Sequence, residues 1–177
     1  MISILLLSWE RHEALAKTMT HNLSGCGAPY ELLVCDQGSK DYRVIEHIES
    51  WHPLYFRRNN KNEGCGKAFN QLYLRSRGDH IALMSNDILW PENWGKTMLN
   101  YSYQLKEKCG MIGINWGHSG TPPLTEKFGI KAHWLNAKLN RIFGPTMIPR
   151  HVIDMVGLYS EDFGPYGIED SDQNERV

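Results

Sequence analysis

The residues best suited to chemistry are acidic side chains near the C-terminus. The segment from Gly164 to Arg176 reads G-P-Y-G-I-E-D-S-D-Q-N-E-R and brings Glu169, Asp170 and Asp172 close together. Neighbouring carboxylates repel one another, which is costly unless they cap a helix, meet cations or accept a proton. Acidic residues are also common in the first turn of a solvated helix. The pattern therefore indicates either a plain helix start or a carboxylate that works as a base.

Two further aspartates each follow an apolar run that predicts a buried strand. Asp36 follows E-L-L-V-C, and Asp87 follows H-I-A-L-M-S-N. A carboxylate placed like Asp36 can accept the N–H of a uracil or thymine ring, although Asp-x-Gly-Ser is also ordinary turn chemistry. A carboxylate placed like Asp87 can hold a divalent cation against a diphosphate, and its plain alternative is to cap the turn at Pro91.

A third polar region, N-E-G-C-G-K-A-F-N from Asn62 to Asn70, opens an expected helix. Gly64 allows the backbone to approach a ligand closely, and a new helix presents N–H groups to an anion. Lys67 would add positive charge near a diphosphate, whereas Ala68 fits helix packing better than ligand contact. The region is not a P-loop, because G-x-x-x-x-G-K is absent.

The elements that would carry these residues alternate along the chain. Apolar runs predict strands at Ile2 to Leu7, Glu31 to Cys35, Leu54 to Phe56, His80 to Met84 and Met111 to Ile114. Helical spacing predicts helices around Leu15 to Leu23, at Asp41 to Trp51, Gly66 to Arg77 and Trp94 to Leu105, and after Arg150. Residues 115–125 read as a loop. This order predicts an α/β fold with a mostly parallel sheet flanked by helices, and ligands outside the carboxyl ends of its strands.

Composition limits the classes of function. A chain of 177 residues fits a single domain, and its net charge of -1 argues against a nucleic-acid binder. The four cysteines form no C-x-x-C pair, so we expect reduced thiols in a cytosolic protein. The opening I-S-I-L-L-L is too short to span a bilayer and reads as a buried strand, so no transmembrane segment is expected.

Taken together and in order, these motifs resemble a family 2 glycosyltransferase of the GT-A fold. The resemblance rests on V-C-D-Q-G-S, N-E-G-C-G-K-A-F-N, S-N-D-I followed by P-E-N-W, and E-D-S-D-Q-N-E-R, and it covers nearly the whole chain. It implies transfer of a sugar, with inversion, from a nucleoside diphosphate sugar of the UDP or dTDP type. The acceptor would be a hydroxyl of a saccharide, a lipid-linked molecule or a protein. It implies a donor-binding part at 1–115 and an acceptor-side part at 116–177.

The resemblance also assigns roles to individual residues. Nucleotide-binding roles fall on Ser8, Arg11, Asp36, Asn62, Gly64 and Lys67. Asp87 would hold Mn²⁺ or Mg²⁺, although Ser85 stands where the family's Asp-x-Asp has its first aspartate. Asp170 would be the catalytic base with Glu169 beside it. Arg11 also has a plain reading, as a helix-start residue paired with a nearby acid.

Two observations bear on the acceptor side. Gln173 and Asn174 replace apolar residues usual in the resembled motif, so we expect their helix to pack less deeply or to meet a different partner. The aromatic residues Trp116, His118 and Trp134 lie in or near the expected acceptor region, where they would stack on sugars or belong to the core.

Two other functions fit parts of the sequence. A sugar nucleotidyltransferase would carry a glycine- and lysine-rich loop after the first strand, where this chain has S-W-E-R-H. A non-catalytic nucleotide-sugar-binding module is favoured by Ser85 and by a chain that stops at Val177, which suggests a fragment or a trimmed domain, whereas Glu169 and Asp170 argue against it. We expect a cytoplasmic protein or one peripheral to a membrane.

Overall fold

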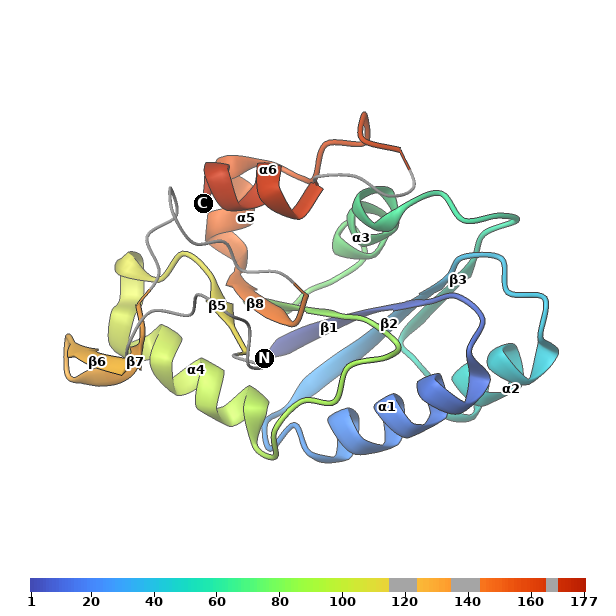
Figure 1. Cartoon of the computed structure of the whole chain (residues 1–177), viewed down its shortest axis with the longest axis horizontal. Coiled ribbons are helices and arrows are strands. Elements are labelled where there is room, and N and C mark those ends of the chain that lie inside the picture. The colour runs from blue at the N-terminus through green and yellow to red at the C-terminus, as the bar shows by residue number, and fades with distance from the viewer. Residues whose placement is uncertain (115–123, 135–143, 165–168) are drawn as a thin grey trace.

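The computed structural model describes residues 1–114, 124–134, 144–164 and 169–177. Its main sheet has six strands in the order β3-β2-β1-β4-β8-β5 (Figure 1). The strands are β1 (Ile2–Ser8), β2 (Tyr30–Asp36), β3 (Tyr55–Arg58), β4 (His80–Met84), β5 (Ile112–Gly113) and β8 (Thr146–Pro149). Strands β1, β2, β3 and β4 run parallel to one another, which confirms the predicted mostly parallel sheet.

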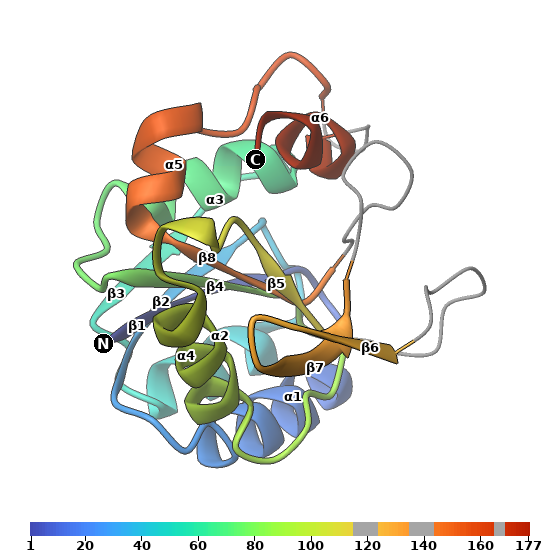
Figure 2. The same ribbon diagram turned by 90° about the vertical axis from the view of Figure 1, so that its left-hand side faces the viewer.

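Helices cover both faces of this sheet, as Figures 1 and 2 show. They are α1 (His12–Ser24), α2 (Tyr42–Ser50), α3 (Cys65–Tyr73), α4 (Trp94–Leu105), α5 (Arg150–Val156) and α6 (Glu169–Arg176), with a short 3₁₀ helix η1 (Lys106–Lys108). One face packs on α1, α2 and α4, and the other packs on α3 and α5. Within the described residues, none of these helices is long and apolar enough to cross a bilayer.

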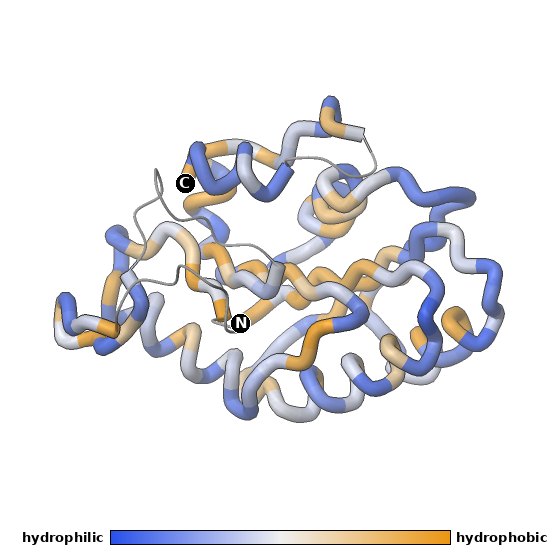
Figure 3. Tube along the Cα trace, viewed as in Figure 1, coloured by the Kyte–Doolittle hydropathy of each residue, from blue (hydrophilic) through white to orange (hydrophobic). Residues whose placement is uncertain are grey.

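Side-chain alternation along the strands builds both cores. In β1, Ile4 and Leu6 belong to one core, whereas Leu5 and Leu7 belong to the other. A strand buried on both faces must be apolar at successive positions, which explains the continuous run that predicted it. Figure 3 shows the same concentration of apolar residues in the central strands.

Strand β8 has no counterpart among the predicted strands. It lies antiparallel between β4 and β5, where Met147 pairs with Ala82 on one side and with Ile112 on the other. The segment has only four residues, T-M-I-P, and is stabilised as a strand by its two neighbours rather than by its own pattern. A short sequence of this kind carries little periodic signal.

Two predicted boundaries were wrong. The helix expected to reach Arg77 ends at Tyr73, because the N–H groups of Arg75 and Ser76 bond to carbonyls three residues earlier and tighten the chain into a turn. The loop expected over 115–125 stops earlier, since β6 (Leu124–Lys127) forms a hairpin with β7 (Ile130–His133). Residues 115–123 lie outside the described part.

Candidate active site

The carboxyl ends of three parallel strands bring predicted nucleotide-binding residues together. Ser8 is the register partner of Asp36, and Asp36 is the partner of Arg58 on β3. Ser8 is buried, and its hydroxyl has no hydrogen-bond partner among the described residues. A buried polar group without a hydrogen-bond partner, at the carboxyl edge of a parallel sheet, is suited to bind a ligand.

Asp36 is fully buried and is bound largely by its own loop. Its Oδ2 atom accepts hydrogen bonds from the backbone N–H groups of Gly38 at 3.1 Å and Ser39 at 2.9 Å, and the Ser39 hydroxyl donates to Oδ1. Arg58 Nε lies 3.7 Å from Oδ2. Because a carboxylate offers about four lone-pair positions, Oδ1 retains room for one further donor.

The loop after β1 is tied to the loop that holds Asp36. The backbone N–H of Glu10 donates to the Ser39 hydroxyl at 2.7 Å, and the Glu10 carboxylate accepts the N–H of Lys40 at 2.9 Å. Glu10 and Arg11 have φ values of 52° and 55°. Positive φ is uncommon for residues with a side chain and clusters at functional sites. The two loops therefore form one unit with a constrained backbone.

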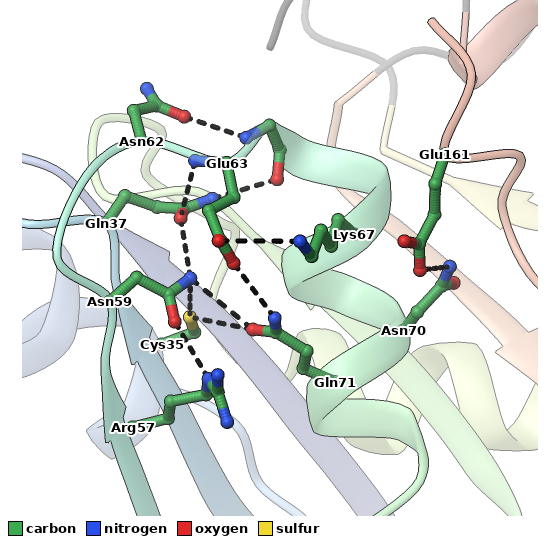
Figure 4. Close-up of polar contacts among 11 residues, drawn as sticks. Cys35, Gln37, Arg57, Asn59, Asn62, Glu63, Lys67, Asn70, Gln71 and Glu161 are labelled. Atoms are coloured by element: carbon green, nitrogen blue, oxygen red, sulfur yellow. Dashed lines mark hydrogen bonds and ion pairs between the residues drawn. The ribbon is translucent and has the colours of Figure 1, made fainter. Parts of the chain in front are cut away.

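The entry to α3 is held by a turn and by a buried amide (Figure 4). Gly64 has a φ of 94°, and its N–H donates to Asn62 Oδ1 at 2.9 Å. The Gln37 side chain donates to the Gly64 carbonyl at 2.8 Å and accepts from the Glu63 N–H at 3.3 Å. Asn62 and Gly64 thus shape the start of α3. Gln37, which the sequence did not single out, connects it to β2.

Lys67 is less available than the sequence suggested. Its ammonium lies 3.4 Å from Glu63 Oε1, and Gln71 donates to the other Glu63 oxygen at 3.1 Å (Figure 4). The hydrogen bond from Gln71, followed by Lys67, lowers the pKa of Glu63. Both side chains of the ion pair are partly exposed, so a diphosphate would compete with Glu63 for the Lys67 ammonium.

Asp87 and Arg11, predicted for cation and nucleotide binding, form an ion pair with each other. Arg11 Nη1 donates to Asp87 Oδ2 at 2.9 Å, and both side chains are exposed. Ser85 has a buried hydroxyl without a partner among the described residues. The pair matches the plain reading of Arg11 and also brings both groups to the same carboxyl edge as Ser8.

The residues around Asp87 fit a divalent cation in part. Within the described residues, no group of three or more His, Cys, Asp or Glu side chains could hold a metal ion. Mg²⁺ sites often use one or two carboxylates, with the remaining positions filled by substrate phosphates and waters. Asp87 therefore fits as the single protein carboxylate of such a site, provided that Arg11 yields one of its oxygens.

Asp170 is the most perturbed carboxyl group of the acidic segment. Burial, and then the neighbouring Glu169, raise its pKa to about 6, while a hydrogen bond from the Gly144 backbone acts in the opposite direction. Burial raises the pKa of Cys65 to about 11, and the charges of Glu169 and Asp170 add to this rise. Since Cys65 is the first residue of α3, the acidic start of α6 faces the start of α3.

The rest of α6 is structural. Arg176 bonds to Asp172 Oδ2 at 2.6 Å and donates to the carbonyls of Val156 and Leu158 at 3.0 and 2.8 Å. Gln173 is only 1% exposed, and its Oε1 accepts a hydrogen bond from Arg176. The expectation of shallower packing was therefore wrong, because the buried polar side chains of this helix find hydrogen-bond partners.

Asn70 joins α3 to the segment that leads toward α6. Its Oδ1 accepts the N–H of Tyr159 at 3.0 Å, and its Nδ2 donates to the Tyr159 carbonyl at 2.9 Å and to Glu161 at 3.0 Å. Asn70 itself is buried, and its three bonds are partly buried, since Glu161 is exposed. The motif contained Asn70 without indicating this role. Ala68 is fully buried in the core beneath α3, which confirms its packing role.

The aromatic candidates of the acceptor side divide into two groups. Trp116 and His118 lie outside the described residues, as do residues 165–168 of the stretch that precedes Asp170. Trp134 follows β7 and packs against Phe128, with ring centroids 5.8 Å apart, while its indole N–H donates to the Thr125 carbonyl at 3.2 Å. Trp134 thus contributes to the β6-β7 hairpin.

Comparisons with known proteins agree with this arrangement. The sequence model of the family described as "Glycosyl transferase family 2" matches residues 3–151. An uncharacterised glycosyltransferase of Bacillus subtilis, YfnE, is 24% identical over 117 residues, which cover 64% of this chain and 30% of the relative. The Escherichia coli protein WfgD, named UDP-Glc:alpha-D-GlcNAc-diphosphoundecaprenol beta-1,3-glucosyltransferase, is 26% identical over 131 residues, which cover 72% of this chain and 50% of the relative.

Solved structures resemble the whole described fold. The mannosyltransferase PcManGT of Pyrobaculum calidifontis, in complex with GDP-Man and Mn²⁺, has a TM-score of 0.68 at 14% identity over 99% of this chain and 50% of its own. TarS of S. aureus in complex with UDP-GlcNAc has a TM-score of 0.70 at 14% identity, over 99% of this chain and 52% of its own. At such identities the likeness shows the GT-A fold alone. The chain spans half the length or less of the two curated relatives.

Proposed function

Because this chain belongs to glycosyl transferase family 2, we propose that it transfers a sugar from a nucleoside diphosphate sugar to an acceptor hydroxyl. The observation that carries the proposal is the meeting of two groups of residues. The loops with Asp36, Arg11 and Asp87 share the carboxyl edge of the sheet, and the start of α3 lies between these loops and the acidic start of α6. The nucleotide-sugar donor and the catalytic carboxylate would thus lie on the two sides of the start of α3.

The donor is proposed to be of the uridine or thymidine type. The remaining lone pair on Asp36 Oδ1 would accept the ring N–H of uracil or thymine, next to the buried hydroxyl of Ser8. Arg11, Lys67 and the turn formed by Asn62 and Gly64 would bind the diphosphate. WfgD is named for a UDP-sugar and TarS was solved with one, which supports this choice, although PcManGT was solved with GDP-Man.

A divalent cation is proposed at Asp87. A Mn²⁺ or Mg²⁺ ion bound there would add positive charge to the diphosphate leaving group. The protein's own part would be to present one carboxylate at the sheet edge and to keep Arg11 close by as a second cation for the phosphates. PcManGT was solved with Mn²⁺, which supports a divalent cation in this fold.

Asp170 is proposed as the base of an inverting displacement. Its carboxylate would take the proton of the acceptor hydroxyl while that oxygen bonds to the anomeric carbon. The bond from this carbon to the diphosphate oxygen breaks, and the nucleoside diphosphate leaves with the electron pair. A single displacement inverts the anomeric carbon. A pKa of about 6 leaves Asp170 mostly ionised near neutral pH and still basic enough to accept a proton.

The remaining assignments are broader. We propose that residues 1–115 bind the donor and that residues 116–177 serve the acceptor, which would be a saccharide, a lipid-linked molecule or a protein. A non-catalytic binding module remains the second candidate, because the Arg11–Asp87 pair occupies the carboxylate that a metal would need. We place the protein in the cytoplasm or at a membrane surface.

The decisive experiment measures nucleotide binding and turnover together. Calorimetry with UDP and dTDP, with and without Mn²⁺, should detect binding, and incubation with UDP-sugars and Mn²⁺ should release UDP. Binding without release from any donor would favour the binding module. Absence of both with every nucleotide would reject the proposed function.

A further inference from the structure

The β6-β7 hairpin stands apart from the main sheet. Its two strands pair only with each other within the described sheets, and all of β6 is exposed. Ile130 on β7 is buried, and Lys108 of η1 lies over the ring of Phe128 on the hairpin. Figure 1 places the hairpin at the end of the molecule opposite α2, and in Figure 2 it faces the viewer. Such a hairpin is well placed to meet a large surface.

Large apolar side chains lie uncovered on this hairpin. Phe128 occupies the turn with a φ of 55° and is 60% exposed, and Leu124 at the start of β6 is 49% exposed. The Phe128 ring packs against Trp134. Single exposed apolar residues are common, but an exposed phenylalanine at a turn, beside a second aromatic ring, is suited to an interaction surface.

Lysines are interleaved with these side chains. Lys108 Nζ lies 4.3 Å from the centroid of the Phe128 ring, and Lys127 Nζ lies 5.9 Å from that of Trp134. Lys131 is also exposed, across from Glu126 on β6. The described residues of η1 and the hairpin carry four lysines, Lys106, Lys108, Lys127 and Lys131, against two glutamates, Glu107 and Glu126. This part of the surface therefore has a net positive charge, although the whole chain has a net charge of -1.

We propose that these residues form a docking surface for an anionic lipid bilayer. We name it the basic hairpin patch, and it consists of Lys108, Leu124, Lys127, Phe128, Lys131 and Trp134. Aromatic rings favour the boundary between headgroups and acyl chains, and lysine stems extend along apolar surface while their ammonium groups reach lipid phosphates. Phe128 enters the headgroup layer at the turn, and the lysines bind the anionic headgroups.

A lipid surface suits this patch better than an acidic protein would. Lipid headgroups accept ammonium groups at any lateral position, so they do not need a fixed pattern of partner carboxylates. The exposed Phe128 ring at the turn can insert between lipids, which charged side chains alone do not do. The inference is independent of Asp36, Asp87 and Asp170, which lie on other elements.

Sedimentation of the full chain with vesicles tests the proposal. The chain should bind vesicles that contain phosphatidylglycerol, bind phosphatidylcholine vesicles weakly, and detach as salt is raised. Phe128→Ala should weaken binding on the order of tenfold, through lost apolar burial. Lys108→Gln and Lys127→Gln should each weaken it roughly fivefold. Tyr42→Ala is the matched control, since Tyr42 is also 60% exposed and lies on α2, and it should leave binding unchanged.

Two further measurements separate the outcomes. Thermal unfolding and UDP binding of Phe128→Ala should match the wild type, so that a loss of vesicle binding reflects the patch. Equal loss in Tyr42→Ala, or no preference for anionic vesicles, would overturn the proposal. Binding to soluble polyglutamate without binding to vesicles would overturn it in favour of an acidic polypeptide. Vesicle binding without any nucleotide binding would retain the docking surface and reject the proposed sugar transfer.

Discussion

The end of β2 and the start of α6 each hold an aspartate, in different surroundings. Asp36 is fully buried and receives two backbone N–H groups and a hydroxyl, with a guanidinium nearby. Asp170 has burial and a neighbouring carboxylate instead, and its pKa rises to about 6. Donors that bond to the ionised form of a carboxylate favour that form, whereas burial beside a like charge disfavours it. Asp36, which is surrounded by hydrogen-bond donors, is suited to be a fixed acceptor, whereas Asp170, which lies beside a carboxylate, is suited to be a base.

The largest expected effect is on transfer by Asp170→Asn. The change keeps the shape of the side chain but removes the proton acceptor, so transfer should fall by roughly 10²–10⁴-fold while UDP binding persists. Steady-state rates and calorimetry on the same preparation measure both quantities. Glu169→Gln and Asp172→Asn are the matched controls and should do much less. Near-normal transfer in Asp170→Asn would show that Asp170 is not the catalytic base.

Asp36→Ala should have the next largest effect, on nucleotide affinity. Loss of a hydrogen bond to a charged acceptor should weaken UDP binding by roughly 10–100-fold in calorimetry. Ser39→Ala is the matched control, because it removes a loop hydrogen bond to Asp36 but leaves the carboxylate in place. An equal loss of affinity in both variants would mean that Asp36 shapes the loop and does not bind the base.

Asp87→Asn should have a smaller effect that depends on metal. If Asp87 holds a cation against the diphosphate, Mn²⁺ should tighten UDP binding in the wild type, and the variant should lose that gain, on the order of tenfold. Arg11→Gln separates the two partners of the ion pair, since it frees Asp87 and should preserve the response to Mn²⁺. Wild-type binding that is unchanged by EDTA would count against the cation.

The smallest expected effect is a gain in stability from the same Asp170→Asn change. The folded-state pKa of Asp170, about 6, lies above its ordinary value of 3.8, so the fold disfavours the ionised form. The stability from this group is fully present below pH 4 and is lost as pH rises through about 6. Asp170→Asn should therefore raise the free energy of unfolding by about 1 kcal/mol at pH 7.5, after allowance for partial exposure.

Urea unfolding at pH 7.5 and at pH 4 checks this sign. The difference between wild type and variant should shrink at the lower pH, where Asp170 is protonated in the folded chain and is close to its ordinary pKa of 3.8 in the unfolded chain. A loss of stability at pH 7.5 would show that the surroundings of Asp170 stabilise its carboxylate. Combined with lost transfer, a gain in stability would mark Asp170 as a costly group kept for its chemistry.

The sequence predicts most strands of the main sheet and the candidate residues, but not the contacts between distant segments. β1, β2 and β4 were predicted because strands buried on both faces are continuous apolar runs. β8 was missed because its four residues become a strand only between β4 and β5. The roles of Gln37 and Asn70 were hidden for a related reason. Asn70 bonds to a residue 89 positions away, and no local pattern encodes such a pairing.

The pairing of Asn70 with Tyr159 has a thermodynamic consequence. One side-chain amide bonds to both the N–H and the carbonyl of Tyr159, in the way that a neighbouring strand would, and burial, followed by the charge of Asp170, raises the pKa of Tyr159. A diphosphate bound at the start of α3 should act on Asp170 in turn, because Asp170 already acts on Cys65 there. Coupling of this kind is reciprocal, so the protonation of Asp170 must shift the affinity for nucleotide by the same factor. UDP affinity measured from pH 5 to pH 7 should therefore change near pH 6 in the wild type and lose that change in Asn70→Ala.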